Sequence, residues 1–208
     1  GLTVSPSSGT NAFAGRLIGN GGLIKNGEGT LALTGTHTFQ GQTRINAGRL
    51  HLNGSAVHSA FRVNGGGTLS GSGTLGELTI ADGGTLAPGN SPGTLSAGDT
   101  RWESGGTFEF EINDAAGIVS TNWDLLAISG TLTIAATGEN PFSLNLNTLT
   151  NANDAGAMDN FNANTDYAWT FLTTTTGISF AEIASLSPTP PAPSPSPPPS
   201  PSSSASSA

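Results

Sequence analysis

The residues best suited to chemistry in this sequence are two glutamates, Glu109 and Glu111, which alternate with Phe108 and Phe110. Because successive side chains of a β-strand point to opposite faces, both carboxylates leave the same face about 7 Å apart. That separation suits a glycosidase pair or a set of oxygen ligands for calcium. The simpler interpretation is that the two glutamates keep the outer face of a strand soluble, since no basic group lies near them in the sequence.

Further acidic and amide side chains follow these glutamates, at Asn113, Asp114, Asn122 and Asp124. They favour calcium binding slightly over catalysis as the role of this patch. The candidate ligands are Glu109, Glu111, Asp114 and Asp124. The Gly-Gly-x-Gly-x-Asp repeat of calcium-binding β-rolls is missing, however. The sequence therefore predicts no catalytic residue, no resident metal and no cofactor.

Other kinds of reactive site lack their usual signatures. The chain has no cysteine, no Gly-x-Ser-x-Gly segment and no P-loop, which argues against thiol, acyl-transfer and phosphoryl-transfer chemistry. The three histidines, His37, His51 and His58, are expected at the surface without a completing acid. Four aromatic side chains could stack on sugar rings, but we favour the interpretation that they fill the wider C-terminal end of the fold. They are Trp102, Trp123, Tyr167 and Trp169.

The elements that position these residues are short strands on a repeating period. Gly-Thr-Leu or a close variant begins at Gly29, Gly48 and Gly67, with 19 residues between successive copies, and recurs further along the chain. Each copy leads into apolar residues at alternate positions, as a strand requires, and turn formers such as Asn-Gly separate the copies. This pattern predicts an all-β fold, a parallel β-helix whose coils stack Leu31, Leu50 and Leu69 in an inward ladder.

Composition agrees with such a solenoid and excludes several partners. Glycine supplies 30 of the 208 residues, and charged residues make up 10%. All six basic residues lie at or before Arg101, and the net charge is −8. A chain with so few cations neutralises few phosphates, so nucleic acid and anionic membranes are not expected partners. No apolar run is long enough for a membrane span.

Three segments resemble a known family. Residues 26–52, Asn-Gly-Glu-Gly-Thr-Leu-Ala-Leu through Gly-Arg-Leu-His-Leu, resemble the passenger-associated repeat of bacterial autotransporters, which also occurs in exosortase-sorted (PEP-CTERM) surface proteins. Residues 67–98 are similar to the coils that follow this repeat, and residues 105–134 to the closing region of the same family. The resemblance implies a right-handed β-helix displayed outside the cell, and it implies no catalytic residues.

The C-terminal residues differ in composition from the rest of the chain. Residues 188–208 consist almost entirely of Pro, Ser and Ala, which cannot form a core and favour an extended polyproline II tail. Such tracts are also typical of O-glycosylated stalks, so Thr189, Ser194, Ser196 and Ser200 are candidate assembly or glycosylation sites. The expected organisation is an N-terminal cap or assembly segment at 1–22, a β-solenoid at 23–187 and a tail at 188–208.

Two functions compete at this point. The first is a non-enzymatic extracellular structural protein, a subunit of a surface fibre, filament or adhesin that stacks head to tail on copies of itself. The second is a secreted β-helix that binds or cleaves carbohydrate, with surface glycans as partners. The lack of basic residues beyond Arg101 favours the first, because a lyase groove normally combines several carboxylates with Lys or Arg.

Overall fold

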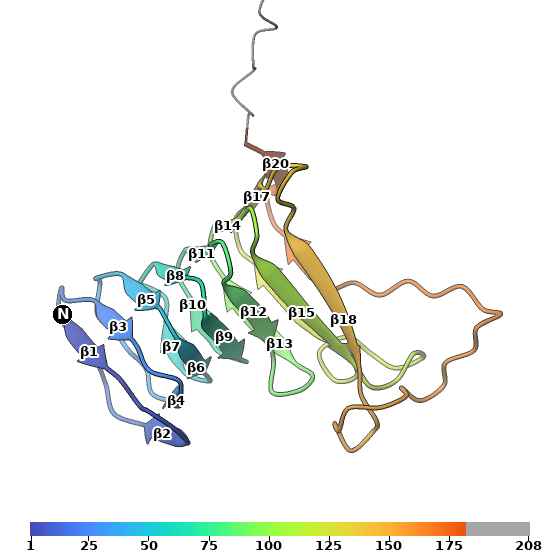
Figure 1. Ribbon diagram of the computed structural model, residues 1–208, viewed down its shortest axis with the longest axis horizontal. Coiled ribbons are helices and arrows are strands. Elements are labelled where there is room, and N and C mark those ends of the chain that lie inside the picture. Colours follow the sequence, from blue (N-terminus) through green and yellow to red (C-terminus); the bar gives the residue numbers. More distant parts are fainter. Residues whose placement is uncertain (182–208) are drawn as a thin grey trace, which may run out of the picture.

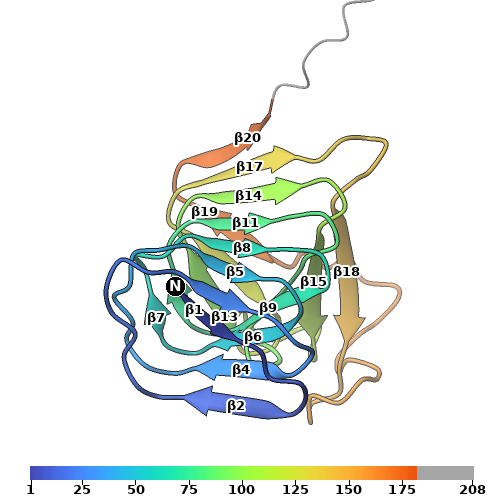
Figure 2. The same cartoon turned by 60° about the vertical axis from the view of Figure 1, so that its left-hand side comes forward.

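The computed structural model describes residues 1–181 and shows a right-handed parallel β-helix, which confirms the fold class expected from the sequence. Successive coils stack beside one another, and three sheets run along the length of the stack (Figure 1). Every pairing between the named strands is parallel. The view turned by 60° shows the coil outline and the order in which the strands of one sheet follow each other (Figure 2).

The three sheets contain eight, seven and five strands. The eight-stranded sheet is formed by β1 (Leu2–Val4), β3 (Leu23–Lys25), β5 (Thr43–Ile45), β8 (Phe61–Val63), β11 (Leu78–Ile80), β14 (Thr100–Glu103), β17 (Thr131–Ala135) and β20 (Gly177–Phe180). The seven-stranded sheet is formed by β2 (Thr10–Phe13), β4 (Thr30–Leu33), β6 (Gly48–Leu52), β9 (Gly67–Gly71), β12 (Thr85–Pro88), β15 (Thr107–Ile112) and β18 (Ser143–Thr148). The five-stranded sheet is formed by β7 (Ser55–Ala56), β10 (Thr74–Leu75), β13 (Thr94–Ala97), β16 (Leu125–Ile128) and β19 (Leu172–Thr174).

The core consists of rows of apolar side chains that run from coil to coil. In the seven-stranded sheet Leu31 pairs with Leu50, and Leu50 pairs with Leu69. All three are buried, and the row continues through Leu86 to Phe108. The leucine of the Gly-Thr-Leu motif therefore points inward in every coil, while the threonine points outward. Burying a leucine in this way contributes roughly 1.5–3 kcal/mol to the free energy of unfolding.

A lysine interrupts one of these inward rows. Lys25 lies between Val4 and Ile45 in the eight-stranded sheet and is fully buried. Its ammonium group donates to the carbonyl oxygens of Asn26 (3.1 Å), Gly27 (2.7 Å) and Ala47 (2.9 Å). Burial lowers the pKa of Lys25. The three carbonyls belong to a corner where the chain leaves the sheet, so the lysine supplies the donors that those turns do not find elsewhere.

Corner residues align in the same way as core residues. Asn46 donates to the side-chain oxygen of Asn26 (2.9 Å), and Asn64 donates to that of Asn46 (2.7 Å). Gly48 forms a neighbouring corner with φ of 61°, and a Cβ there would lie 2.5 Å from the carbonyl oxygen of Gly27. Only glycine fits this combination of positive φ and close backbone approach. At Gly29 and Gly67, which open other copies of the motif, φ is not positive, and the close approach alone requires glycine, since a Cβ would lie 2.8 Å from the carbonyl oxygen of Ser8 and 2.4 Å from that of Ile45.

The first coil begins earlier than the sequence indicates. Residues 1–22 are not separate from the solenoid, because β1 pairs with β3 and β2 pairs with β4. The sequence did not reveal this coil, since Thr10–Phe13 lacks apolar alternation and is exposed along its whole length. The tail at 188–208, with Thr189, Ser194, Ser196 and Ser200, lies outside the described residues.

The C-terminal coils are wider than the others. A long connection, residues 149–171, links β18 to β19 and extends away from the stack (Figure 1). Inside these coils Trp102 stacks on Phe142 with ring centroids 4.3 Å apart, and Phe108 contacts Phe171 edge to face. Aromatic side chains thus fill the greater width. Residues 1–181 contain no helix, and so none that is long and apolar enough to cross a membrane.

Replacing Lys25 with methionine tests the role of the buried ammonium group. We expect Lys25→Met to lower the free energy of unfolding by about 2–4 kcal/mol, because three corner carbonyls lose their donor while the apolar part of the side chain is kept. Urea unfolding followed by circular dichroism measures the change. Arg49→Met, which removes an exposed cation, is the matched control and should cost much less. Equal losses in the two variants would show that the three hydrogen bonds contribute little.

Candidate functional site

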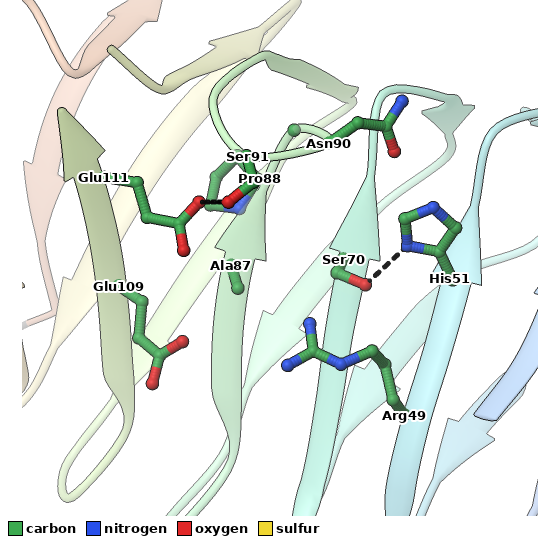
Figure 3. A pocket seen from close by; sticks show the side chains of 10 residues that line it. Arg49, His51, Ser70, Ala87, Pro88, Asn90, Ser91, Glu109 and Glu111 are labelled. Carbon is green, nitrogen blue, oxygen red and sulfur yellow. Dashed lines mark hydrogen bonds between the residues drawn. The ribbon is translucent and has the colours of Figure 1, made fainter. Parts of the chain in front are cut away.

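A groove with a volume of about 430 Å³ lies on the outer face of the seven-stranded sheet. It crosses β6, β9, β12 and β15, and the loop after β12 closes one side of it (Figure 3). We call this feature the sheet groove. Its lining residues are Arg49, His51, Ser70, Ala87, Pro88, Gly89, Asn90, Ser91, Glu109 and Glu111.

The strand register explains how these side chains meet. Thr85 of β12 pairs with Thr107 of β15, so Ala87 lies beside Glu109 one pleat further along. His51 pairs with Ser70, and Ser70 pairs with Ala87. The outward row from β6 to β15 therefore reads His, Ser, Ala, Glu. Two small side chains form the floor of the sheet groove, with larger polar side chains on the strands to either side.

The two walls carry opposite charge. Arg49 and His51 stand on β6, and Glu109 and Glu111 stand on β15. β6 and β15 are three strand spacings apart, roughly 14 Å, and in Figure 3 the side chains of Arg49 and Glu109 point toward each other above Ala87. Within residues 1–181, the ion pairs join Glu103 to Arg62 and to Arg101, so neither Arg49 nor Glu109 takes part in one.

The loop at one side of the groove is held by a buried acid. Asp124 is fully buried, and its two carboxyl oxygens accept hydrogen bonds from the backbone N–H of Gly93 (2.9 Å) and of Glu111 (2.9 Å). Within the same loop the Ser91 hydroxyl donates to the Glu111 carboxylate (2.6 Å). Asp124 therefore ties the loop of residues 89–93 to β15, and this contact sets the position of Ser91 and Glu111 in the groove wall.

Burial raises the pKa of Asp124 to about 8, against an ordinary value of 3.8. The two backbone N–H donors act in the opposite direction because they stabilise the carboxylate. Removal from water outweighs them, and the nearby carboxylates of Glu111 and Glu109 add repulsion that also raises the pKa. At neutral pH Asp124 is accordingly mostly protonated, and the carboxylates of the groove wall are spared a third negative charge beside them.

His51, Ser70 and Asn53 form a chain of hydrogen bonds that superficially matches a hydrolase triad. His51 Nδ1 lies 2.9 Å from Ser70 Oγ, and His51 Nε2 lies 3.0 Å from Asn53 Nδ2. The backbone N–H of Ser72 donates to Asn53 Oδ1, which fixes the orientation of the amide. Asn53 therefore donates to Nε2, and the ring proton sits on Nδ1.

That tautomer argues against the acyl-transfer role that such a chain of hydrogen bonds would suggest. His51 Nδ1–H donates to Ser70 Oγ and has no lone pair there to take the serine proton, so Ser70 is not activated as a nucleophile. Burial and the neighbouring Arg49 both lower the pKa of His51, which favours the neutral ring. The chain of hydrogen bonds thus orients the groove wall and does not form a catalytic triad.

The candidate calcium ligands do not converge. Glu109 and Glu111 line the sheet groove, whereas Asp124 is buried behind it. Asp114 accepts hydrogen bonds from the backbone of Ala116 and the side chain of Asn160. In the part of the chain that the structure describes, no three His, Cys, Asp or Glu side chains are grouped so as to hold a metal ion.

The two histidines outside the sheet groove lie in different environments. His58 is exposed, but His37 is buried, and the expectation of a surface position was wrong for it. His37 Nδ1 accepts from the backbone N–H of Leu17 (3.2 Å), and its ring lies between Phe13 and Phe39. A polar residue was expected outside, yet this one satisfies a backbone donor in the first coil.

The aromatic residues do not gather into one sugar-binding platform. Trp102 is buried against Phe142. Tyr167 stacks on Trp169 and on Phe161 within the connection after β18. The faces of these rings are therefore largely occupied by other rings of the same chain.

Sequence reasoning found Glu109 and Glu111 but missed Arg49, Ser70, Asn90 and Ser91. One signal for Arg49 was present. The outward position of the Gly-Thr-Leu motif carries threonine at Thr30, Thr68 and Thr85, and Arg49 is the departure from it. The register of four strands places Glu109 in the outward row of His51 and Arg49 in the neighbouring row, and this was not visible in the sequence.

Titration of Asp124 predicts a pH dependence of stability. Between pH 4 and 8 the unfolded chain has lost this proton and the native chain retains it, so the free energy of unfolding should fall as pH rises, by up to about 1.4 kcal/mol per pH unit. Asp124→Asn removes that contribution. We expect the difference between the variant and the wild type to change steadily over this range and to level off above pH 8. Urea unfolding at several pH values measures it, and parallel profiles for the two proteins would contradict the assignment.

Comparison with known proteins agrees with this architecture. Residues 23–52 match the passenger-associated-transport-repeat family, which confirms the resemblance seen in the sequence. The chain is 38% identical over 105 residues to an extracellular serine protease of Serratia marcescens, and 38% identical over 84 residues to the adhesin BmaC autotransporter of Brucella suis biovar 1 (strain 1330).

These matches are local. They cover 50% and 39% of this chain but only 10% of the protease and 2% of the adhesin. The similarity therefore extends to a small part of each relative and not to its whole length. The chain therefore carries an autotransporter passenger repeat, built as a β-helix, and is a secreted or cell-surface protein.

Proposed function

We propose that this chain is a non-enzymatic, adhesin-like structural segment at the cell surface, which forms a rod by stacking end to end on further copies of itself. The observation that carries the proposal is the state of the two end coils. Within residues 1–181, several apolar side chains at inward positions of these two coils are exposed, whereas most side chains of the same rows are buried in the coils between them.

The C-terminal end coil shows this most clearly. Its inward positions are held by Leu144 and Leu146 of β18 and by Ile178 and Phe180 of β20. These side chains are 50%, 52%, 52% and 74% exposed. Of their partners one coil earlier, Phe108 and Leu132 are fully buried, Phe110 is buried and Ile134 is half-buried. The last coil thus presents an apolar surface together with the unpaired backbone groups of its strands.

The N-terminal end coil presents a matching surface. Leu2 is 47% exposed and Phe13 is 38% exposed, and an apolar hollow of about 240 Å³ opens between β1 and β2. β1 and β20 are the two edges of one sheet, and β2 and β18 are the two edges of another. Because all strands of a sheet run the same way, β20 of one copy can be continued by β1 of the next in the register used throughout. The row that begins at Val4 and ends at Phe180 would then continue from Phe180 of one copy to Val4 of the next.

Two features of the sheet groove support a non-enzymatic role. Glu111 accepts the Ser91 hydroxyl and so helps to hold the loop at residues 89–93. His51 is hydrogen-bonded in the tautomer that cannot activate Ser70. Glu111 and His51 are therefore engaged in shaping the groove wall.

A charge placed on the end coil should prevent stacking. We expect the wild-type chain to form concentration-dependent oligomers in sedimentation velocity, and Leu146→Lys to shift it to the monomer, because an unpaired ammonium group would be buried at the contact. Val57→Lys replaces an apolar side chain that is 45% exposed in mid-solenoid, away from both ends, and serves as the matched control. A wild-type chain that is monomeric at all concentrations would contradict end-to-end stacking.

Incubation with polysaccharides tests for catalysis. We expect the purified chain to release no reducing ends from acidic or neutral polysaccharides, because the groove offers no activated nucleophile. The double variant Glu109→Gln with Glu111→Gln is the comparison. Turnover by the wild type that the double variant lacks would establish a glycosidase and overturn the non-enzymatic assignment.

A further inference from the structure

We propose that the sheet groove binds a short oligosaccharide that contains a carboxylated sugar, with the sugar carboxylate at Arg49 and the sugar hydroxyls at Glu109 and Glu111. This inference deepens the proposed surface role, on which it rests, by naming the ligand class that the rod would recognise. Four observations about the groove support it.

The first observation is where charge occurs in the seven-stranded sheet. Its outward positions are mostly Thr, Ser, Ala and Asn, and its charged members are Arg49, Glu109 and Glu111. All three line the same groove. Charges scattered for solubility alone would be distributed over the whole sheet. Here they converge on one hollow.

The second observation is that these groups are held ready for a ligand. No hydrogen bond from the side chain of Arg49 or Glu109 to another of the described residues is present, and neither group is in an ion pair. Ser70 and Ala87 between them are too short to fill the gap. A guanidinium group without a protein partner is the usual recognition group for a carboxylate, which it binds through two parallel N–H donors.

The third observation is the chemistry of the opposite wall. Glu109 and the free oxygen of Glu111 offer only acceptors. The Asn90 amide, which offers both a donor and an acceptor, lies on the other side of the groove near His51 (Figure 3). Closely spaced hydroxyls satisfy such a wall, because each can donate to a carboxylate while accepting elsewhere. The arrangement fixes the orientation of an acidic sugar, since its carboxylate would be repelled from Glu109 and attracted to Arg49.

The fourth observation concerns the floor and separates a saccharide from a peptide. The apolar side chains in the sheet groove are only Ala87 and Pro88, so it offers no pocket for the side-chain anchors of a peptide. β9 and β12, which form the floor, are paired on both sides, so no free strand edge is available for backbone pairing. The volume of about 430 Å³ lies within the range of small-molecule sites.

Titration with defined oligosaccharides tests the proposal. The probes are trigalacturonic acid and 3′-sialyllactose, with maltotriose and lactose as neutral counterparts and triglutamate as an acidic peptide. Calorimetry gives the affinity, and amide chemical shifts locate the site. We expect at least one acidic saccharide to bind at least tenfold more tightly than its neutral counterpart and to shift the amides of Ser70, Asn90 and Glu109.

Two variants and a control identify the groups responsible. Arg49→Gln should weaken the acidic saccharide at least tenfold, and Ala87→Leu should abolish binding by filling the floor from its outward side. Arg101→Gln removes an exposed arginine from the eight-stranded sheet and should leave affinity unchanged. The proposal would be overturned if neither acidic saccharide bound, or if the neutral saccharides or triglutamate bound as tightly as the acidic ones. An unaltered affinity in Arg49→Gln would also overturn it.

The outcome is separable from that of the stacking proposal. Arg49→Gln should sediment as the wild type does, because Arg49 is remote from both end coils. Leu146→Lys should bind the saccharide as the wild type does, because the groove is complete within one copy. Normal stacking without saccharide binding by the wild type would therefore refute the ligand proposal and leave the stacking proposal intact. Saccharide binding by a wild-type chain that does not stack would refute the stacking proposal alone.

Discussion

Each coil of this molecule buries its apolar side chains by lying against the coils before and after it, and the rest of the structure depends on that constraint. A single coil encloses too little volume to remove its own leucines from water. Leu50 is fully buried because Leu31 and Leu69 lie on either side of it in the same row. The requirement dictates a parallel register, an inward position that stays apolar from coil to coil, and corners tight enough for the chain to return to the same row.

The same constraint explains where polar groups enter the interior. Lys25 occupies an inward position, and it is accommodated since its ammonium group reaches the corner and donates to three carbonyls. Asp124 is buried where the regular stack is interrupted. β12 and β15 pair only at Thr85 and Leu86, after which the loop at residues 89–93 leaves the sheet. Asp124 supplies the acceptors that this loop and β15 require, and the sheet groove lies on the outer side of that interruption.

The repeating part of this arrangement could be predicted from the sequence, whereas the features that depart from the repeat could not. Gly-Thr-Leu and its alternation were enough to place Leu31, Leu50 and Leu69 in one row, because each copy contains its own strand and corner. The first coil was missed since Thr10–Phe13 is polar and exposed, and it is recognisable as a strand only through its pairing with β4. His37 was placed outside because its partner, the backbone of Leu17, is 20 residues away. Half of the groove was missed for the same reason, because the position of Arg49 on the wall that faces Glu109 depends on the register of four strands.

Electrostatics shows why the groove differs from the rest of the surface. On the eight-stranded sheet Arg44 and Arg62 are direct neighbours, and their repulsion is offset by Glu103, which binds Arg62 through two hydrogen bonds of 3.1 and 2.8 Å and lies 3.6 Å from Arg101. Charges there neutralise one another within the protein. On the seven-stranded sheet Arg49 stacks between Thr30 and Thr68, so it meets no like charge in its row, and Ser70 and Ala87 separate its strand from that of Glu109. The small side chains of Ser70 and Ala87 thus keep the cation and the carboxylates too far apart to pair with each other. Such an arrangement is complementary to a ligand that carries a carboxylate at one end and hydroxyl groups at the other.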